Sequence, residues 1–355
     1  MTDGMTNAPK LRVGIAGYGA VGRLRHSFID ENRHFQTVAV CDQKFGQGAE
    51  TPRGLVAHQT YSPLLDENLD VLFVCVPNYL APEITIAGLE RGLHVFCEKP
   101  PGRDLDDVVR VMQCEQRHPG LKLMYGFNHR YHDSVREALR LVQSGELGRL
   151  IDLRGVYGKS QMIRFDAEWR TQRAFAGGGV FLDQGIHMID MMRMFAGEFT
   201  EIHSIVSNEY WKHDVEDNVY ALMRTADGVV AMLQSSATQW RHRFDLDMTL
   251  EKGSISLSGI LSSTKSYGAE TITVAWKGRD DRGDPKQQTT RFNEDHSWQD
   301  EIGAFANAIT GNAPIEFGTS TEALQTMRLV YQVYCADPVW KARYRLSDVP
   351  SREVQ

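Results

Sequence analysis

The segment Gly17-Tyr18-Gly19-Ala20-Val21-Gly22 constrains the fold of this chain more than any other feature of the sequence. An apolar run, Leu11 to Ala16, precedes it, and Arg23 to Asp30 follows with the pattern of a short helix. A strand, a glycine-rich turn and a helix in this order are typical of a unit that binds a dinucleotide. We therefore predict that a pyrophosphate approaches this turn closely, where the helix N-terminus offers unpaired N–H groups.

A second apolar run, Val38 to Cys41, ends at Asp42, twenty residues after the last glycine of the turn. An acid at this place accepts hydrogen bonds from the adenosine ribose and repels a 2′-phosphate. No arginine follows Asp42 directly, although Lys44 is close. The sequence therefore favours NAD over NADP as the cofactor.

Composition excludes several classes of partner. With 355 residues, 42% of them hydrophobic and 24% charged, the chain is long enough for two domains of an ordinary globular protein. Its formal charge of −7 lacks the basic excess needed to bind nucleic acid or an anionic membrane surface. No apolar run reaches the ~18 residues of a membrane helix. From the charge we expect no nucleic-acid partner, and from the charge and the short apolar runs we expect no membrane partner.

The N-terminal residues and the cysteines indicate the cellular compartment in which we expect the protein. Residues 1–9 are polar, lack the apolar core of a signal peptide and are expected to form a flexible tail. No two cysteines have the spacing of metal ligands; they stand at Cys41, Cys75, Cys97, Cys114 and Cys335. We expect reduced cysteines, no metal and a cytoplasmic location.

Strand and helix patterns alternate through the first ~125 residues, which predicts a parallel sheet with crossover helices. The expected strands are Leu11–Ala16, Thr37–Cys41, Val71–Val76, His94–Cys97 and Lys122–Tyr125, and further helices are expected over Pro82–Arg91 and Leu105–Gln116. We expect residues 10–128 to form a dinucleotide-binding domain with its ligand at the carboxyl edge of the sheet.

After about residue 128 the pattern changes to consecutive strands, flanked by helices. Helices are expected over Asp133–Ser144, Val180–Phe195, Ser297–Thr310 and Ser320–Tyr334. Strands are expected over Leu150–Gly158, Glu201–Tyr210, Val219–Arg224, Val229–Ser236, Phe244–Glu251, Ser254–Leu257 and Thr271–Ala275, and an exposed loop over Arg279–Lys286. Short turns such as Asp227-Gly228 predict a largely antiparallel sheet. We expect residues 129–345 to form an α+β domain, the last helices of which can return to the first domain.

Polar residues stand where two of the expected strands give way to loops. One strand ends in Val76-Pro77-Asn78 and the next in Cys97-Glu98-Lys99-Pro100. Alone, each could be an ordinary loop, but the carboxyl edge of such a sheet is where its ligand binds. We therefore expect both loops to lie along the cofactor.

Asp183 and His187 stand four residues apart in an otherwise apolar helix, which places them on one face. A surface ion pair would be the ordinary interpretation of such a spacing. The apolar neighbours indicate a buried helix instead, and Gly177-Gly178-Gly179 permits a close approach to its N-terminus. The pair is therefore a candidate for acid–base chemistry.

Four motifs occur in a fixed order: Gly17-Tyr18-Gly19-Ala20-Val21-Gly22, Glu98-Lys99-Pro100, Gly126-Phe127-Asn128-His129-Arg130 and Gly178-Gly179-x3-Asp183-x3-His187. Together they resemble the glucose–fructose oxidoreductase / inositol dehydrogenase (Gfo/Idh/MocA) family over nearly the whole chain. The resemblance implies an α/β protein with an N-terminal Rossmann domain. It also implies a C-terminal α+β domain whose large, mostly antiparallel open sheet often forms the interface of a homodimer or homotetramer.

The resemblance also implies roles for individual residues of an NAD(P)-dependent dehydrogenase. Lys99, Asp183 and His187 would form the catalytic group. Cofactor contacts are expected from Gly17, Tyr18, Gly19, Ala20, Val21, Gly22, Asp42, Val76, Pro77, Asn78, Glu98, Lys99, Pro100 and Asn128, and substrate contacts from Arg130, Tyr157, Trp169 and Arg170. Ala81 stands where the family often carries a histidine, which bears on a cofactor or loop contact and not on the chemistry.

On this hypothesis hydride passes between nicotinamide and a secondary alcohol or ketone. His187 would be the base, Lys99 would hold the reacting oxygen, and Asp183 would orient His187 or bind a neighbouring hydroxyl. Cationic and aromatic residues suit a sugar that carries an anionic group, such as a nucleotide sugar; they are Lys159, Arg164, Trp169, Arg170, Arg173 and Trp240-Arg241-His242-Arg243.

Several alternatives stay open at this point. The cationic residues could equally form surface salt bridges, for example with Asp166, Glu168 and Asp245. An inositol or free-aldose dehydrogenase is the second interpretation within the same chemistry. A non-catalytic dinucleotide sensor, or a reductase of a carbonyl that is not a sugar, belongs to another class.

Overall fold

The computed structural model describes residues 9–48, 50–160, 168–262, 267–278 and 284–351. In this part of the chain six parallel strands form a sheet in the order β3-β2-β1-β4-β5-β6. The strands are β1 (Leu11–Ala16), β2 (Phe35–Cys41), β3 (Val56–His58), β4 (Val71–Val74), β5 (His94–Glu98) and β6 (Leu123–Gly126). They are joined through α1 (Ala20–Glu31), η1 (Gln43–Gln47), α2 (Tyr61–Leu65), α3 (Ala81–Glu90) and α4 (Leu105–Gln116).

This sheet has the doubly wound order predicted from the alternating strand and helix patterns. Every residue of β4, Val71 to Val74, is buried, as expected of a strand covered by helices on both faces. The chain order reverses between β1 and β4, which pair directly. The reversal opens a crevice at the carboxyl ends of these strands, where the glycine turn lies.

A second sheet has the strand order β14-β13-β12-β11-β7-β10-β9-β8, all within the described residues. Its strands are β7 (Leu150–Gly158), β8 (Phe199–Ser207), β9 (Asn218–Thr225), β10 (Val230–Ser236), β11 (Arg243–Leu250), β12 (Gly253–Ser258), β13 (Glu270–Trp276) and β14 (Lys286–Phe292). Neighbouring strands of this described sheet are antiparallel except β7 and β10, which are parallel. The predicted fold class is therefore confirmed.

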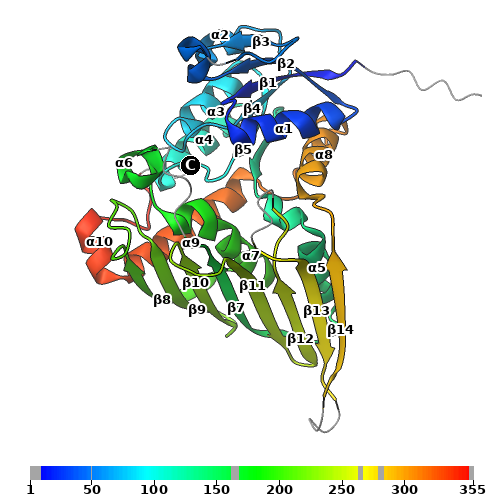
Figure 1. The fold of residues 1–355 in the computed structure, drawn as a ribbon, viewed down its shortest axis with the longest axis vertical. Helices are drawn as coiled ribbons and strands as arrows, with labels where there is room; N and C mark the ends of the chain where they lie inside the picture. The colour runs from blue at the N-terminus through cyan, green and yellow to red at the C-terminus, as the bar shows by residue number, and fades with distance from the viewer. Residues whose placement is uncertain (1–8, 49, 161–167, 263–266, 279–283, 352–355) are drawn as a thin grey trace, which may run out of the picture.

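Helices separate the two sheets and cover one face of the second, as Figure 1 shows. They are η2 (Asn128–Tyr131), α5 (Asp133–Ser144), η3 (Glu168–Thr171), α6 (Arg173–Ala176), η4 (Phe181–Gly185), α7 (Ile186–Ala196), α8 (Ser297–Thr310), α9 (Ser320–Ala336) and α10 (Pro338–Tyr344). Helix α7 packs on β7, and α9 packs on β8 and also on α4. None of the described helices is long and apolar enough to span a membrane.

Helix α8 returns to the parallel sheet. Phe305 packs against Phe35, Phe73 and Phe96 with ring centroids 5.6 to 6.3 Å apart. The last third of the chain therefore helps to bury the first sheet. The domain limits expected at residues 10–128 and 129–345 stay predictions.

A buried ionic cluster fixes α8 to α1 and to the parallel sheet. The Arg25 guanidinium of α1 is fully buried and donates to Glu98 Oε1 and to Glu301 Oε2, both at 2.6 Å. The rings of Phe96 and Trp298 cover its faces at 4.5 and 4.2 Å. One cation thus joins α1, the end of β5 and α8.

This cluster predicts a pH dependence of stability. Burial raises the pKa of Glu301 from 4.5 to about 7, despite the attraction of Arg25. The folded chain therefore holds a proton that the unfolded chain releases, so this group's contribution to stability falls as pH rises from about 4.5 to about 7. Glu301→Gln should remove that part of the decline in unfolding free energy measured with denaturant, whereas Asp300→Asn, at a partly exposed neighbour, should leave the decline unchanged.

The structure adds a strand, β14, that the sequence pattern does not predict. Residues 279–283 of the loop expected over Arg279–Lys286 lie outside the described residues, and β14 begins at the last residue of that range. Every residue of β14 before Phe292 is exposed, so the strand lacks the alternation that marks a half-buried strand. The single helix expected over Val180–Phe195 begins as a π-helical turn, η4, which continues into α7.

Candidate active site

The glycine turn has the shape that a bound pyrophosphate requires. The φ angle of Gly17 is +89°, and a Cβ there would lie 2.3 Å from the carbonyl oxygen of Cys75. A Cβ at Gly22 would lie 2.0 Å from the carbonyl oxygen of Gly17 and would push α1 away from the turn. At Gly19 a Cβ would meet no described atom within 4 Å, and no described side chain caps α1 there. The N-terminus of α1 is therefore open to an anion.

Asp42 is fixed beside this turn at the end of β2. Its Oδ2 accepts from the N–H of Tyr18 at 2.9 Å, and its Oδ1 accepts from the N–H of Lys44 at 3.0 Å. Each carboxylate oxygen keeps a second lone pair for a ribose hydroxyl. The geometry fits the adenosine end of NAD.

Removing the charge of Asp42 tests the cofactor preference. Asp42→Asn keeps the shape and one acceptor but no longer repels a 2′-phosphate. Because like charges in contact cost several kcal/mol, we expect the ratio of kcat/KM for NADP to that for NAD to rise by about 10²-fold. Steady-state kinetics with both cofactors measure this ratio, and an unchanged ratio would contradict the assignment.

Lys99 and Asp183 meet at the carboxyl edge of the parallel sheet. Lys99 follows β5 directly, and its Nζ donates to the main-chain oxygen of Asp183 at 2.5 Å. Nζ also lies 3.7 Å from Asp183 Oδ1, and both side chains are about one-fifth exposed, at 20% and 23%. Burial would raise the pKa of Asp183, but Lys99, Arg170 and Lys159 outweigh it and hold that pKa below 3.8. Asp183 is therefore an anion held among three cations.

His187 lies one turn farther along, in α7. The residue is 5% exposed, and its Nδ1 has no hydrogen-bond partner among the described residues. Its ring stacks on His129, with centroids 3.8 Å apart and planes 12° apart. Burial, and then His129, Lys99 and His132, lower the pKa of His187 well below 6.5. His187 is therefore a neutral imidazole at neutral pH.

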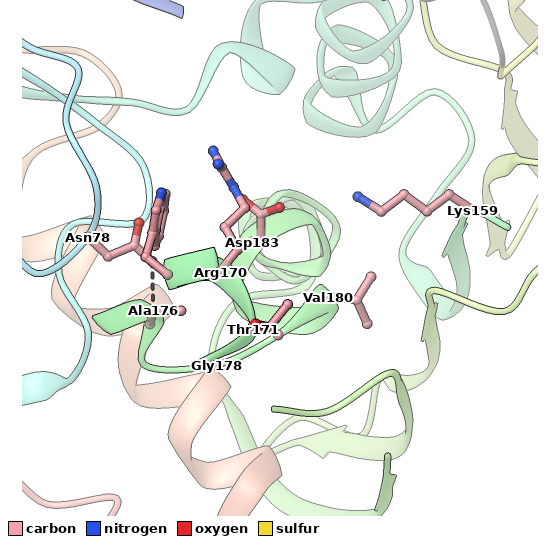
Figure 2. A pocket seen from close by; sticks show the side chains of 10 residues that line it. Asn78, Lys159, Arg170, Thr171, Ala176, Gly178, Val180 and Asp183 are labelled. Atoms are coloured by element: carbon pink, nitrogen blue, oxygen red, sulfur yellow. Dashed lines mark hydrogen bonds between the residues drawn. The ribbon is translucent and has the colours of Figure 1, made fainter. Parts of the chain in front are cut away.

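A pocket adjoins Asp183, and Figure 2 shows its lining. The lining residues are Asn78, Lys159, Trp169, Arg170, Thr171, Ala176, Gly178, Gly179, Val180 and Asp183. Lys159 points toward Asp183 from the end of β7, and Arg170 lies beside Asp183 (Figure 2). Burial, together with Lys99 and Arg170, lowers the pKa of Lys159 from 10.5 to about 8, although Asp183 opposes this shift.

The remaining predicted cofactor residues lie around the crevice. Asn78 follows β4 and donates through Nδ2 to the carbonyl oxygen of Ala176 at 2.7 Å, which joins this loop to α6. Asn128 follows β6 and donates to the Ser297 hydroxyl at 3.1 Å. Val76 and Pro77 lie just past β4, and Glu98 and Pro100 flank Lys99.

Two predicted substrate residues are engaged elsewhere. Arg130 is 2% exposed, and its guanidinium donates to both oxygens of Asp190 at 2.7 Å and also to Glu322. Arg130 therefore forms a buried ion pair in this structure, and its expected contact with substrate stays a prediction. Tyr157 is 6% exposed, and its hydroxyl lies 3.1 Å from His129 Nε2, so it contacts a neighbour of the proposed base.

The Arg130 cluster predicts a large effect on stability. Arg130→Met leaves Asp190 buried without its cation, which typically costs about 3–5 kcal/mol of unfolding free energy. Arg136→Met breaks an exposed pair with Asp300 and should cost no more than about 1 kcal/mol. Chemical denaturation of both variants checks this, and equal losses would show that burial does not set the cost.

The other predicted cationic residues divide between two places. Trp169 and Arg170 line the pocket, with the guanidinium 4.3 Å from the Trp169 ring. Arg173 lies over the Tyr344 ring at 4.6 Å. Arg243 pairs with Asp245, so a salt bridge is the better interpretation for Arg243. Arg164 lies outside the described residues.

Two models of one protein family match the chain. The model described as "Oxidoreductase family, NAD-binding Rossmann fold" matches residues 11–127, and that of the GFO/IDH/MocA C-terminal domain matches residues 135–256. The chain belongs to the Gfo/Idh/MocA family. It is therefore an oxidoreductase with an NAD-binding Rossmann fold, as the resemblance implied.

Individual members of the family are distant in sequence. Levoglucosan dehydrogenase of Pseudarthrobacter phenanthrenivorans is 28% identical over 196 residues, 48% of this chain and 50% of that protein. D-glucoside 3-dehydrogenase of Escherichia coli K12 is 29% identical over 265 residues, 66% of this chain and 72% of that protein. WlbA dehydrogenase from Bordetella pertussis, solved with NADH and UDP-GlcNAcA, shares the fold with a TM-score of 0.77, at 20% identity over 93% of this chain and 97% of that one. The chain thus spans half the length of the first of these relatives.

Sequence reasoning undervalued two residues of this site. Lys159 was placed among general anion-binding candidates, and His129 entered only as a letter of a motif. Lys159 comes directly after β7, and His129 stands three residues after the end of β6. A polar residue at the carboxyl end of a buried strand is the signal that could have singled them out.

Proposed function

We propose that this Gfo/Idh/MocA protein transfers hydride between NAD and a secondary alcohol or ketone of a sugar or sugar derivative. One observation carries the proposal: Lys99 of the Rossmann edge contacts Asp183, one turn before His187. A donor, an anion and a neutral base from two parts of the chain meet where the fold binds nicotinamide. A non-catalytic sensor would have no need of this arrangement.

Each residue has a separate task in this proposal. When bound, the nicotinamide ring accepts the hydride of the CH–OH carbon or returns it. His187 removes the hydroxyl proton, which requires its ring to be neutral. Lys99 donates a hydrogen bond to the same oxygen and stabilises the developing alkoxide. Asp183 faces Lys99, which favours a role in holding Lys99 and a neighbouring hydroxyl over a role in orienting His187.

The pocket supports a sugar that carries an anionic group. Lys159 and Arg170 bring two cations to a wall where Asp183 is the acidic lining residue. The two cations outnumber the one acid, so a phosphate or carboxylate of the substrate would pair with the positive charge that Asp183 does not balance. Trp169 offers a ring face to the sugar. WlbA, with the same fold, is solved with a nucleotide sugar bound.

A ligand panel tests the substrate class. Purified protein loaded with NAD is screened by thermal shift and by nicotinamide absorbance against nucleotide sugars, sugar acids, inositols and free aldoses. We expect stabilisation and turnover with anionic sugars, and a loss of affinity for them in Lys159→Met. Turnover of neutral polyols alone would overturn the anionic substrate, and stabilisation by sugars without any turnover would favour a sensor.

We also propose a homo-oligomer formed through the second sheet. Its face opposite α7 and α9 exposes Ile205, Tyr220, Leu222 and Met232, each at least 45% exposed. Ile205 pairs with Tyr220 and Leu222 with Met232 across β8, β9 and β10, so these side chains form one apolar patch. Such patches on a protein surface commonly mark interfaces. Light scattering should report a dimer or tetramer that Leu222→Lys dissociates.

A cytoplasmic location is proposed from the cysteines. Cys41, Cys75, Cys97, Cys114 and Cys335 are all free thiols. Unpaired cysteines are usual where the compartment keeps thiols reduced. Fractionation of the producing cell tests this location, and recovery outside the cytoplasm would overturn it.

A further inference from the structure

The ring of His129 lies against His187 in a place that the proposed reaction does not use. The two imidazoles are nearly parallel at a centroid separation of 3.8 Å. Both residues are buried, at 8% and 5% exposed. His129 belongs to η2 and His187 to α7, so the stack joins the end of the parallel sheet to the helix that carries the proposed base.

Hydrogen bonds fix His129 at both ring nitrogens. The Ser297 hydroxyl donates to Asp295 at 2.6 Å, so Ser297 can only accept from Asn128 Nδ2, at 3.1 Å. The amide oxygen of Asn128 therefore faces His129 Nδ1 at 3.2 Å, and Nδ1 must carry the proton. His129 Nε2 is then the acceptor for the Tyr157 hydroxyl at 3.1 Å. His129 is thus held as one neutral tautomer.

His187 has no comparable hydrogen bond at its buried nitrogen. Its Nδ1 lacks a partner among the described residues, whereas a catalytic histidine is commonly oriented there by a carboxylate. The face of His129 packs against the His187 ring, and the Phe127 ring forms a T-shaped pair with His187 at a centroid distance of 6.3 Å. Ring packing therefore replaces the missing hydrogen bond.

We propose that His129 is a positioning residue, whose tethered ring sets the plane of the His187 imidazole and keeps that imidazole neutral. This inference rests on the proposed function, in which His187 is the base. Two stacked, buried imidazoles cannot both carry a proton without strong repulsion. The pKa values of both histidines lie well below 6.5, chiefly because the rings are buried.

The charged and titratable groups around the stacked pair come from several elements. Lys99 faces it from the end of β5 and His132 from the end of η2, and both oppose a further positive charge. His132 is itself bonded to Glu270 of β13 through Nδ1 at 2.8 Å. Tyr157 approaches from β7, and Asp183 lies on the turn before α7. Replacing His129 should leave these groups in place.

Two substitutions in the full-length protein separate the effect of the stacked His129 ring from the effect of the hydrogen bonds at its nitrogens. His129→Ala removes the stacked face, and we expect kcat to fall by about 10²-fold, because a misplaced base costs this much. His129→Phe keeps a flat ring without tethers, so its loss should be several-fold smaller. In His129→Ala water enters and the acid limb of kcat/KM should move to higher pH, while the KM for NAD should not change.

A readout independent of turnover separates this inference from the proposed function. NMR titration of ¹³C-labelled histidines, with the His187 signal assigned by its loss in His187→Ala, should show the His187 pKa rising by about one unit in His129→Ala. His34→Ala, at the opposite edge of the sheet, is the matched control and should change nothing. Equal kinetic losses in His129→Ala and His129→Phe, or an unchanged His187 titration, would overturn the inference. Full turnover in His187→Ala would overturn the proposed function instead.

Tyr157→Phe provides a second test should His129→Ala fail to fold. It keeps both stacked rings and removes the tether at His129 Nε2. We expect a smaller fall in kcat and a shift of the acid limb in the same direction. A fall in kcat with no shift of the limb would show that the tether does not act through His187.

Discussion

Lys99→Met should lower kcat for sugar oxidation by about 10²–10⁴-fold, while the affinity for NAD should change little. The substitution keeps the apolar stem and removes the ammonium that contacts Asp183. The developing alkoxide then loses its hydrogen-bond donor, and Asp183 loses its nearest cation. NAD should still bind, because the glycine turn and Asp42 lie at the other end of the crevice.

Stopped-flow measurement of NAD reduction reports the rate, and equilibrium quenching of the protein's tryptophan fluorescence by NAD reports the affinity, so the two effects are separated. Lys252→Met is the matched control, since Lys252 is exposed in the turn between β11 and β12. The control should keep full kcat. A Lys99→Met variant with full kcat, or one that fails to bind NAD, would show that Lys99 does not stabilise the reacting oxygen.

His187→Ala should cost a similar factor, about 10²–10⁴-fold in kcat, and should also change the pH profile. In the unaltered protein the pKa of His187 lies well below 6.5, so its ring stays neutral to lower pH than that of an ordinary histidine. Activity should therefore persist below pH 6.5 and fall only as pH drops through that lowered pKa. The variant should lack this acid limb.

The profile of kcat/KM against pH in both proteins measures the limb. His34→Ala, again the control, should keep the limb and the rate. A limb that survives in His187→Ala would assign it to another group, and the base would then have to be sought elsewhere in the pocket.

The sequence was sufficient to predict most of the fold. Strand β1 and helices α4, α5 and α8 have the predicted limits, because apolar periodicity and capping residues mark them. The Asp104 side chain, for example, accepts from the N–H of Asp107 and begins α4 where expected. Strand β14 could not be predicted, since its exposed polar side chains are held by main-chain pairing with β13.

The sequence indicated which side chains come together at this edge but not the partners that hold them, and their expected roles stay predictions. Lys99, Asp183 and the pocket residues Trp169 and Arg170 do come together. Arg130 does not join them, because its partners Asp190 and Glu322 lie 60 and 192 residues away in sequence. Long-range pairing of this kind leaves no local pattern.

The triple glycine before η4 predicts a close approach to the helix N-terminus, and the structure shows one. A Cβ at Gly179 would lie 2.1 Å from the carbonyl oxygen of Glu216. The close approach is therefore made by the chain's own backbone. Sequence can show that a position demands glycine, but the neighbour that demands it is set by the tertiary fold.

The most direct test of the account follows the hydrogen itself. A substrate found by the panel is labelled with deuterium at the reacting carbon and mixed with NAD and the protein in a single turnover. We predict that deuterium appears on the reduced nicotinamide and slows its formation, and that Lys99→Met and His187→Ala, both loaded with NAD, form almost none. Reduced nicotinamide without deuterium, or undiminished transfer in both variants, would contradict hydride transfer at this site.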